Sequence, residues 1–323
     1  MNLIELKEKI KKGYNITQEE AVELYNCDIK ELSETANEIR EYFMKDSFDL
    51  CTIVNAKCGK CSENCKFCAQ SAHYGTNVED YPLLPDDEIV QDAIKNHEQG
   101  ILRYSIVTSG KKLSDEDVIN EARIIRKIKE ACNIEICVSN GLLSYENFKI
   151  LKEAGASRVH NNLESAPSYF PSICTTHTIE EKIQALENAR KAGLEVCSGG
   201  IIGLGETREQ RVEMAIKLRE LGIKSVPVNV LNPIPNTPFG NNEVLSEEEV
   251  IKTVAVYRLI LPKSFIRLAG GRALFNDKGR AIFKSGANAA ISGDMLTTSG
   301  INTQSDLQIL EELKFKPRII SIL

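Results

Sequence analysis

The sequence predicts an α/β fold, a (β/α)8 TIM-type barrel preceded by an N-terminal helical extension. After about residue 48, short apolar and β-rich runs alternate with longer amphipathic segments. This alternation is typical of parallel strands joined by helices, and eight such units in about 250 residues suit a closed barrel. An open doubly wound sheet is the alternative arrangement of the same units.

The expected strands cover residues 50–56, 102–107, 134–138, 157–161, 194–198, 225–230, 264–268 and 288–291. Helical patterns lie between them, at 114–131, 144–154, 178–192, 207–221 and 246–261. Gly155, Gly193 and Gly222 each stand just before an expected strand, where a glycine commonly ends a helix.

Residues 1–45 are expected to form the helical extension, and residues 46–323 the barrel. Thr17 and Glu20 form a capping-box pattern that opens a helix expected to end near Asn26. The proline-rich stretch 232–240 follows the sixth expected strand. It therefore belongs to the barrel face that holds active sites in this architecture.

Composition and charge favour a cytoplasmic protein that acts on a small molecule. The 323 residues carry a net charge of −6, which gives no electrostatic attraction to nucleic acid or to an anionic membrane. The longest apolar stretches have the length of strands, so no membrane span is expected. The first residues mix charges at helical spacing and lack the apolar core of a signal peptide.

The cysteines indicate metal chemistry. Five of the ten lie between residues 51 and 68, and a chain without a secretion signal is not expected to use them as a disulfide framework. Cys61, Cys65 and Cys68 have the spacing C-x₃-C-x₂-C directly after the first expected strand. Thiolates this close can hold one iron–sulfur cluster. Three ligands leave one iron of a four-iron cubane open to a substrate or cofactor.

A zinc site is the alternative for the same cysteines. Cys58 brings the number to four cysteines in eleven residues, and the chain would then be a zinc-stabilised binding protein without catalysis. Zinc sites more commonly pair two C-x₂-C hooks that lie far apart in the sequence, so the zinc interpretation fits this spacing poorly.

The cysteine spacing, with Phe67 just before the third cysteine, resembles the signature of the radical S-adenosylmethionine (SAM) superfamily. The resemblance implies a 4Fe–4S cluster whose open iron binds the amino acid part of SAM. It also implies that the reduced cluster cleaves SAM to methionine and a 5′-deoxyadenosyl radical, with Phe67 near the adenine.

Segments further along the chain are similar to the biotin synthase family. They are 160–165 (HNNLES), 174–178 (CTTHT), 196–207 (VCSGGIIGLGET), 225–229 (SVPVN), 266–272 (IRLAGGR), 286–288 (GAN) and 296–298 (LTT). The similarity runs in the family's order from about residue 45 to 310. It implies a sulfurtransferase that inserts sulfur into dethiobiotin to form biotin, with an auxiliary iron–sulfur cluster as the sulfur donor. It also implies an electron donor such as flavodoxin or ferredoxin, and a homodimer.

The resemblance assigns the cofactor-binding roles residue by residue. Asn162 and Glu164 would hold the SAM ribose, and Lys182 would meet the methionine carboxylate. Gly203 belongs to a glycine-rich segment that would pass close to the cofactor, because glycine permits close backbone approach.

The substrate-binding roles follow in the same way. Asn162 and Asn229 would read the ureido ring of dethiobiotin, since an amide side chain offers both a donor and an acceptor. Thr297, with Thr298, would cap the substrate carboxylate. Taken alone, an asparagine near a strand end is more often a turn residue.

The auxiliary cluster departs from the family pattern. The family's usual 2Fe–2S cluster is held by three cysteines and an arginine, and Cys137, Cys197 and Arg267 match three of these positions. The fourth position holds Ser105, whose hard oxygen is a poor replacement for thiolate. Either the cluster is absent or another thiol has replaced the missing one.

Cys51 is the candidate for that thiol, because its expected strand neighbours the strand of Ser105. Adjacent strands lie about 4.8 Å apart, a shift too large for the same small cluster to stay in place. We therefore hypothesise a cluster on Cys51, Cys137 and Cys197. A four-iron type is possible, with Arg267 or an extra sulfide on its remaining iron. Cys197 and Arg267 would be the catalytic pair.

Two questions stay open from the sequence. Sister enzymes of the same barrel, a hydrogenase-cluster maturase or a methylornithine-forming mutase, would also explain the missing cysteine at Ser105. The substrate-side residues favour the biotin synthase family instead. Cys27, Cys132 and Cys174 are expected to be small packing residues, and Cys58 either contacts iron or is an incidental loop thiol.

Overall fold

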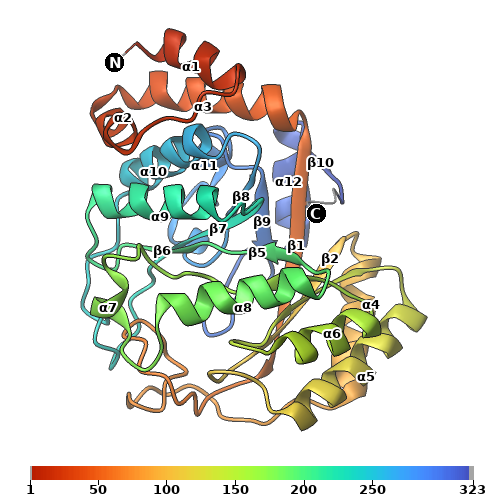
Figure 1. Cartoon of the computed structure of the whole chain (residues 1–323). Coiled ribbons are helices and arrows are strands. Elements are labelled where there is room, and N and C mark those ends of the chain that lie inside the picture. Colours follow the sequence, from red (N-terminus) through yellow and green to blue (C-terminus); the bar gives the residue numbers. More distant parts are fainter. Residues whose placement is uncertain (1, 320–323) are drawn as a thin grey trace.

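A computed structural model describes residues 2–319, and its strands form a closed parallel barrel (Figure 1). The barrel strands are β1 (Ser47–Lys57), β2 (Arg103–Thr108), β3 (Glu135–Ser139), β4 (Ala156–His160), β5 (Glu195–Cys197), β6 (Gly200–Ile202), β7 (Ser225–Val230), β8 (Phe265–Leu268) and β9 (Ala289–Ser292). Neighbours pair in chain order, and β1 pairs with β9 to close the ring. The predicted barrel is confirmed, and the open sheet is excluded.

The fifth barrel position is split into two short strands. β5 pairs with β4 and β7, whereas β6 pairs with β7 and, through Gly200, with Glu164 in the segment after β4. Gly199 lies at the break, where an added Cβ would clash with the backbone of Pro227. At Gly200 an added Cβ would clash with the side chain of Met214 and the backbone of Glu164. The expected strand over 194–198 is observed as the shorter β5, and the tight contacts at 199 and 200 admit only glycine.

Helices cover the outside of the barrel. The longer ones are α4 (Asp86–Glu98), α5 (Asp115–Ala131), α6 (Tyr145–Ala154), α8 (Ile179–Lys191), α9 (Arg208–Glu220) and α10 (Glu247–Ile260). The shorter ones are α7 (Phe170–Ile173), α11 (Arg280–Phe283) and α12 (Thr303–Glu312). Their N-caps are mostly Ser or Thr, whose hydroxyl accepts a backbone N–H of the first turn, as for Ser114 and Thr178. The five predicted helices are confirmed to within a residue or two at each end.

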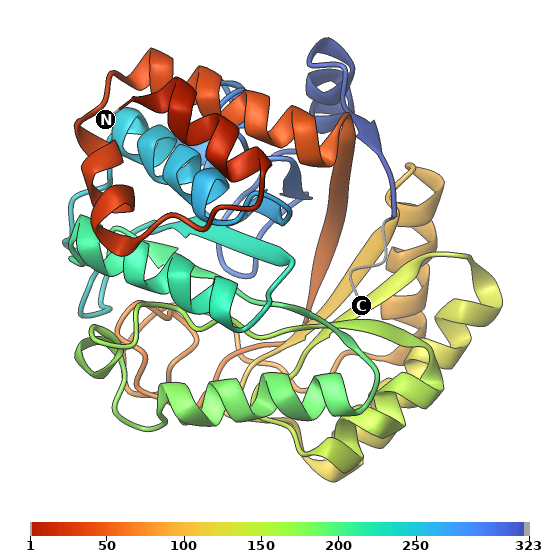
Figure 2. The ribbon, with the colours of Figure 1, turned by 45° about the horizontal axis from the view of Figure 1, so that its top comes forward.

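The N-terminal extension packs on one side of the barrel (Figure 2). It consists of α1 (Leu3–Lys11), α2 (Gln18–Glu23), the 3₁₀-helix η1 (Leu24–Asn26) and α3 (Ile29–Met44). The predicted capping box is present, with Glu20 N–H donating to Thr17 Oγ1 and Thr17 N–H donating to Glu20 Oε2. α3 lies along α10, and α2 contacts α9. Tyr25, which is buried, donates its hydroxyl to Thr253 on α10 (3.2 Å).

The C-terminal segment joins the start of the first strand. β10 (Lys316–Pro317) pairs with β1 at Ser47 and Phe48. The ring of Phe48 contacts those of Phe283 and Phe315, with centroids 5.3 and 5.1 Å apart. Among residues 2–319, no helix is long and apolar enough to cross a membrane.

Helix α5 carries a fully buried carboxyl group, Glu121. Asn140 Nδ2 donates to Glu121 Oε2 (2.7 Å), while Glu121 Oε1 and Asn140 Oδ1 have no hydrogen-bond partner within the described range. Burial raises the pKa of Glu121 to about 8. A proton on this carboxyl supplies the donor that the pair of oxygens lacks.

We predict that Glu121 makes the protein less stable as the pH rises. The folded carboxyl has the higher pKa, so its contribution is fully present below about pH 4.5 and is lost as the pH rises through about 8. Glu121→Gln keeps the hydrogen bond and removes the titration, so it should stabilise the fold by about 4 kcal/mol at the upper end of this range. Urea unfolding of the two proteins near pH 5 and pH 8 measures the difference. An equal difference at both pH values would contradict the prediction.

Candidate active site

Inward-facing side chains of the strands surround a cavity of about 410 Å³. Alternate residues contribute to it, such as Cys51 and Ile53 of β1, because successive side chains of a strand point to opposite faces. The lining includes most of the predicted site residues: Cys51, Cys61, Cys65, Phe67, Cys68, Cys137, Asn162, Glu164, Lys182, Cys197, Asn229, Arg267 and Thr297. Of the predicted residues, all of them in the described part of the chain, only Gly203 does not line it.

Cys61, Cys65 and Cys68, here called the loop cysteines, stand on the loop between β1 and α4. Backbone hydrogen bonds hold the loop in shape, since Cys61 N–H donates to the Gln70 carbonyl (3.0 Å) and Cys68 N–H to the Cys65 carbonyl (3.0 Å). All three side chains are partly exposed and line the cavity. Three cysteines on one loop that line a common cavity are the donor set that a cluster requires.

The zinc alternative does not fit this loop. Within the described residues, only Cys65, Cys174 and His177 have ligand atoms that all lie within 4.8 Å of one another, so the loop cysteines do not gather around one ion. Cys58 is buried, pairs through its backbone with Tyr81 and does not line the cavity.

Asn162 and Glu164 follow the carboxyl end of β4, and Lys182 lies in the first turn of α8. Asn162 Oδ1 accepts the N–H of Gly199 (3.1 Å), and Lys182 Nζ donates to Asn161 Oδ1 (3.5 Å). Glu164 has a φ of 70°, a left-handed conformation that is uncommon outside glycine. The lining therefore combines a carboxylate, an amide and a buried ammonium group near the loop cysteines.

Gly203 belongs to a turn built on a carboxylate. The N–H groups of Gly203 and Leu204 donate to Glu206 Oε1 and Oε2 (2.8 and 2.7 Å). Glu206 also pairs with Arg211 (2.5 Å), which in turn pairs with Glu249 (2.6 Å). The carboxylate of Glu206 therefore holds the turn through two backbone hydrogen bonds and one ion pair.

The predicted substrate residues lie on β7 and on the loop after β9. Asn229 already bonds to the backbone at both ends of its amide, donating to the Gly200 carbonyl (3.1 Å) and accepting from Gly270 N–H (2.9 Å). Thr297 and Thr298 line the cavity from the loop after β9. Asn229 is thus fixed in orientation before any ligand arrives.

Deeper in the barrel lie Cys51, Cys137 and Cys197, here called the inner cysteines, each less than a tenth exposed. Arg267 Nη1 donates to Cys51 Sγ (3.1 Å), and Ser225 Oγ donates to Cys197 Sγ (3.1 Å). The three thiols and the guanidinium of Arg267 all face the cavity, which fits the donor set of a second cluster.

The strand register separates Cys51 from Ser105. Ser105 stands opposite Ile53 on β1 and Cys137 on β3, whereas Cys51 stands opposite Arg103. Cys51 is therefore one inward position further down the barrel than Ser105, in addition to being on the neighbouring strand.

Beneath the inner cysteines lies a buried ion network of two carboxylates and three guanidinium groups, here called the floor network. Arg158 pairs with Asp49 and Glu195 (both 2.8 Å), and Arg267 pairs with Asp49 (2.9 Å). Arg103 lies 4.0 Å from Asp49 and 3.9 Å from Glu195. Three positive groups against two negative ones leave excess positive charge under the thiols.

This charge arrangement sets the acidity of the buried groups. Burial alone would raise the pKa of Asp49, but the three arginines hold it well below the usual range. Burial likewise opposes ionisation of Cys197, but His160, Arg267 and Arg158 lower its pKa to about 7. Burial raises the pKa of Cys137 to about 12. Cys197 is therefore the inner cysteine that most readily becomes a thiolate ligand.

Sequence reasoning named Arg267 but missed Asp49, Arg158 and Glu195. All three are charged residues on barrel strands and are buried in the described structure. The sequence did contain a signal for them. A charged residue within a short barrel strand must be buried, and a buried charge needs a partner of opposite charge.

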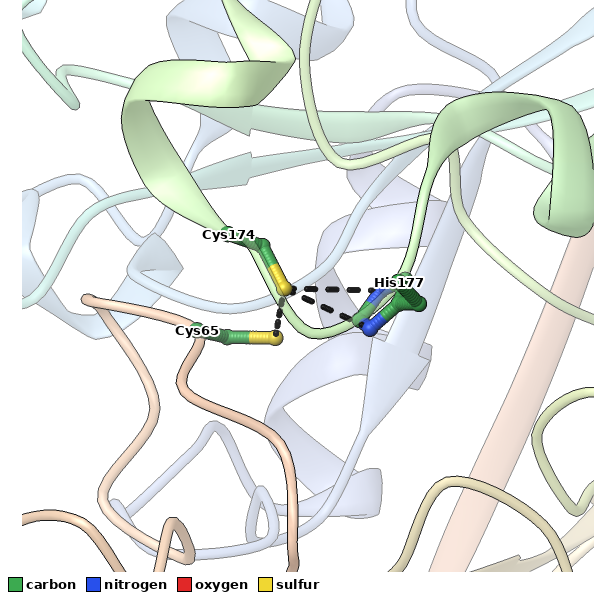
Figure 3. Close-up of side chains that lie close together, drawn as sticks. All are labelled: Cys65, Cys174 and His177. Atoms are coloured by element: carbon green, nitrogen blue, oxygen red, sulfur yellow. Dashed lines mark hydrogen bonds between the residues drawn. The ribbon is translucent and has the colours of Figure 1, made fainter.

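Cys174 is buried and packs in the core, as predicted, but it also makes polar contacts that the sequence did not predict. Its Sγ lies 3.7 Å from Cys65 Sγ and 3.3 Å from His177 Nδ1 (Figure 3). His177 Nδ1 also lies 2.5 Å from Glu63 Oε2. These contacts were not predicted because residues 63–65 and 174–177 belong to two loops that are far apart in the sequence and meet only in the fold.

Comparison with known proteins agrees with this site. A family model described as "Radical SAM superfamily" matches residues 57–218, and one described as "Biotin and Thiamin Synthesis associated domain" matches residues 227–316. The barrel, the loop cysteines and the first match define a radical SAM enzyme.

Curated relatives narrow the class. The chain is 53% identical over 315 residues to "Biotin synthase" of Clostridium botulinum (strain Loch Maree / Type A3), covering 98% of this chain and 99% of that protein. It is also 53% identical to "Biotin synthase" of Brachyspira hyodysenteriae (strain ATCC 49526 / WA1), covering 98% and 95%. The chain therefore belongs to the biotin synthase family. Its cofactors are a 4Fe–4S cluster, SAM and an auxiliary iron–sulfur cluster.

Solved structures support the fold. "Crystal structure of methylornithine synthase (PylB)" superposes with a TM-score of 0.84 over 97% of each chain, at 19% identity. "Crystal structure of HydG: A maturase of the [FeFe]-hydrogenase" superposes with a TM-score of 0.82, covering 99% of this chain and 76% of that one, also at 19% identity. The two sister enzymes considered from the sequence thus share the barrel, and at this identity the likeness concerns the fold alone.

We predict that Asp49→Asn destabilises the protein by about 3 kcal/mol, because it leaves buried guanidinium groups without their shared carboxylate. Asp117→Asn is the matched control, since the pair of Asp117 with Lys57 (2.8 Å) is partly exposed and should cost less than about 1 kcal/mol. Denaturant unfolding of the cluster-free proteins measures both values. If the two variants lost the same free energy of unfolding, the predicted contribution of the floor network to stability would be wrong.

Proposed function

We propose that this chain forms biotin from dethiobiotin in the cavity between the loop cysteines and the inner cysteines. One observation carries the proposal: a single cavity is lined by both sets of three thiols, with the amide of Asn229 in the same lining. A substrate bound there can meet a radical source on one side and a sulfur source on the other. The family membership supports the same reaction.

The groups bound at these sites supply a 5′-deoxyadenosyl radical and sulfur, chemistry that side chains cannot provide. The chain's own residues bind and orient the reactants. Asn162, Glu164 and Lys182 hold SAM by its ribose and carboxylate, with Phe67 against the adenine. Their position in the lining near the loop cysteines supports this assignment.

Asn229 orients the ureido ring of dethiobiotin, and Thr297 caps its carboxylate. The backbone bonds at both ends of the Asn229 amide support this role, because they fix its direction and leave one lone pair on its oxygen and one N–H for a ligand. Asn162 has the same character, since its Oδ1 accepts from Gly199. Gly203 passes close to the cofactor, and the turn that it forms with Glu206 positions this segment.

The auxiliary cluster is held by Cys51, Cys137 and Cys197, with Arg267 or an extra sulfide completing it. Arg267 already contacts Cys51 Sγ, and the excess positive charge of the floor network favours an anionic cluster. Ser105 stands above Cys51 and offers a hard oxygen, so it is not a ligand. The offset of Cys51 favours a four-iron cluster over a 2Fe–2S cluster in the family's usual position.

Three further assignments rest on the sequence and the family alone. They are an electron donor such as flavodoxin or ferredoxin, a homodimeric state and a cytoplasmic location. The division into residues 1–45 and 46–323 belongs with them.

We predict that the reconstituted protein, incubated anaerobically with dethiobiotin, SAM, a reductant and sulfide, forms both biotin and 5′-deoxyadenosine. Cys61→Ala should form neither, because one ligand of the radical-generating cluster is lost. Mass spectrometry of both products is the measurement. Formation of 5′-deoxyadenosine without biotin would reject the proposed reaction and indicate a sister enzyme.

We predict that a triple variant with Cys61, Cys65 and Cys68 changed to alanine still binds the auxiliary cluster. Adding Cys51→Ala to this variant should remove most of the remaining iron and sulfide, whereas adding Cys27→Ser should not. Iron and sulfide analysis with Mössbauer spectroscopy measures both. A triple variant without any cluster, or a cluster insensitive to Cys51→Ala, would refute the proposed ligand set.

A further inference from the structure

Cys65, Cys174 and His177 have the geometry of ligands to a single metal ion. Their ligand atoms all lie within 4.8 Å of one another, and the two sulfurs are 3.7 Å apart (Figure 3). A tetrahedral ion with metal–sulfur bonds of about 2.3 Å places two sulfurs about 3.8 Å apart, and a sulfur and a nitrogen about 3.5 Å apart. The two ring nitrogens of His177 lie 3.3 and 3.9 Å from Cys174 Sγ.

Glu63 gives this group the support that metal-binding histidines usually have. Its Oε2 lies 2.5 Å from His177 Nδ1, and Glu63, Cys174 and His177 are all less than a tenth exposed. A carboxylate on one ring nitrogen fixes the tautomer and turns the other nitrogen toward the metal. The nitrogen that Glu63 leaves free is Nε2, which lies 3.9 Å from Cys174 Sγ, whereas Nδ1 lies 3.3 Å from the same sulfur.

The two loops that carry these ligands are docked by polar contacts. Asn64 Oδ1 accepts Thr175 N–H (2.9 Å), Asn64 Nδ2 donates to Thr175 Oγ1 (2.7 Å), and Asn64 N–H donates to Thr176 Oγ1 (3.1 Å). Lys66 N–H donates to the Ile173 carbonyl (2.9 Å). Residues on both sides of Cys65 are therefore bonded to residues on both sides of Cys174, which holds the two thiols together.

We propose that the cluster-free chain binds one thiophilic divalent metal ion on Cys65, Cys174 and His177. Two metal–sulfur bonds and one metal–nitrogen bond form, and the two thiol protons leave to solvent. Ferrous iron and zinc share the required chemistry, and zinc binds such sites more tightly. The site and the radical-generating cluster exclude each other because both use Cys65, a statement that rests on the proposed role of the loop cysteines.

The ion has consequences for loading the cluster. Ferrous iron on this site stands beside the loop cysteines, where it can be passed to them. Zinc on the same site occupies Cys65 and blocks the cluster. Cys174 is thus a metal ligand that acts before the cluster is present.

Cobalt(II) is a suitable probe, because thiolate ligation and tetrahedral geometry both give it characteristic absorption bands. The full-length chain is stripped of metal anaerobically and titrated with cobalt(II). The parent should bind one more cobalt per chain than Cys174→Ala, with thiolate-to-cobalt and tetrahedral bands. A double variant with Cys61 and Cys68 changed to alanine should keep this site, and Cys132→Ser serves as the unaffected control.

Two further variants test the ligand set. His177→Ala should lose the tetrahedral bands, and Glu63→Gln should weaken cobalt binding about tenfold or more, since it removes the anionic partner of the imidazole. Loss of the site in the Cys61 and Cys68 double variant, together with its retention in Cys174→Ala, would overturn the proposal. The ion would then lie on the cysteine loop.

Zinc tests whether the metal ion and the cluster compete for Cys65. Zinc added before reconstitution should slow cluster formation several-fold in the parent and not in Cys174→Ala, as followed by iron–sulfur absorbance. Equal slowing in both would overturn the proposed competition. Failure of these metal titrations leaves the biotin assay unaffected, because that assay uses the cluster-loaded enzyme.

Discussion

The pairing of Asp49 with Arg158 and Arg267 is the interaction on which the barrel interior depends. Charges buried this deeply are tolerated only when they are paired, and removing one partner leaves the other uncompensated. Asp49 belongs to β1, Arg158 to β4 and Arg267 to β8, while Arg103 and Glu195 add β2 and β5. The network therefore ties five strands together at one level of the barrel.

The same network determines what can bind above it. Thiolate ligands and an iron–sulfur cluster bring negative charge into the barrel, and the excess guanidinium charge compensates it. Arg267 belongs to both layers, since it pairs with Asp49 and donates to Cys51 Sγ. On the proposed ligand set, a thiol in place of Cys51 at the level of Ser105 would lie further from this contact. The position of the third thiol, on β1 at the level of Cys51, therefore allows it to contact Arg267 below.

Periodicity predicted the barrel because each strand and helix buries one face against its neighbours, and the cysteine spacing predicted the cluster loop because its ligands are local. Features that depend on contacts between distant segments escaped. The break at Gly199 follows from the approach of Pro227, the floor network joins Asp49 to Arg158, and Cys174 meets a loop more than a hundred residues earlier in the chain. None of these features is marked in the sequence by a periodic pattern or by a local motif.

The loop cysteines and the inner cysteines lie at different depths, which favours one order of cluster loading. The inner cysteines are buried and line the cavity, and the floor network beneath them is itself buried. The loop cysteines line that same cavity and are partly exposed. An occupied outer cluster with SAM narrows the path to the inner site. On the proposed ligand sets, filling the inner site first avoids this obstruction.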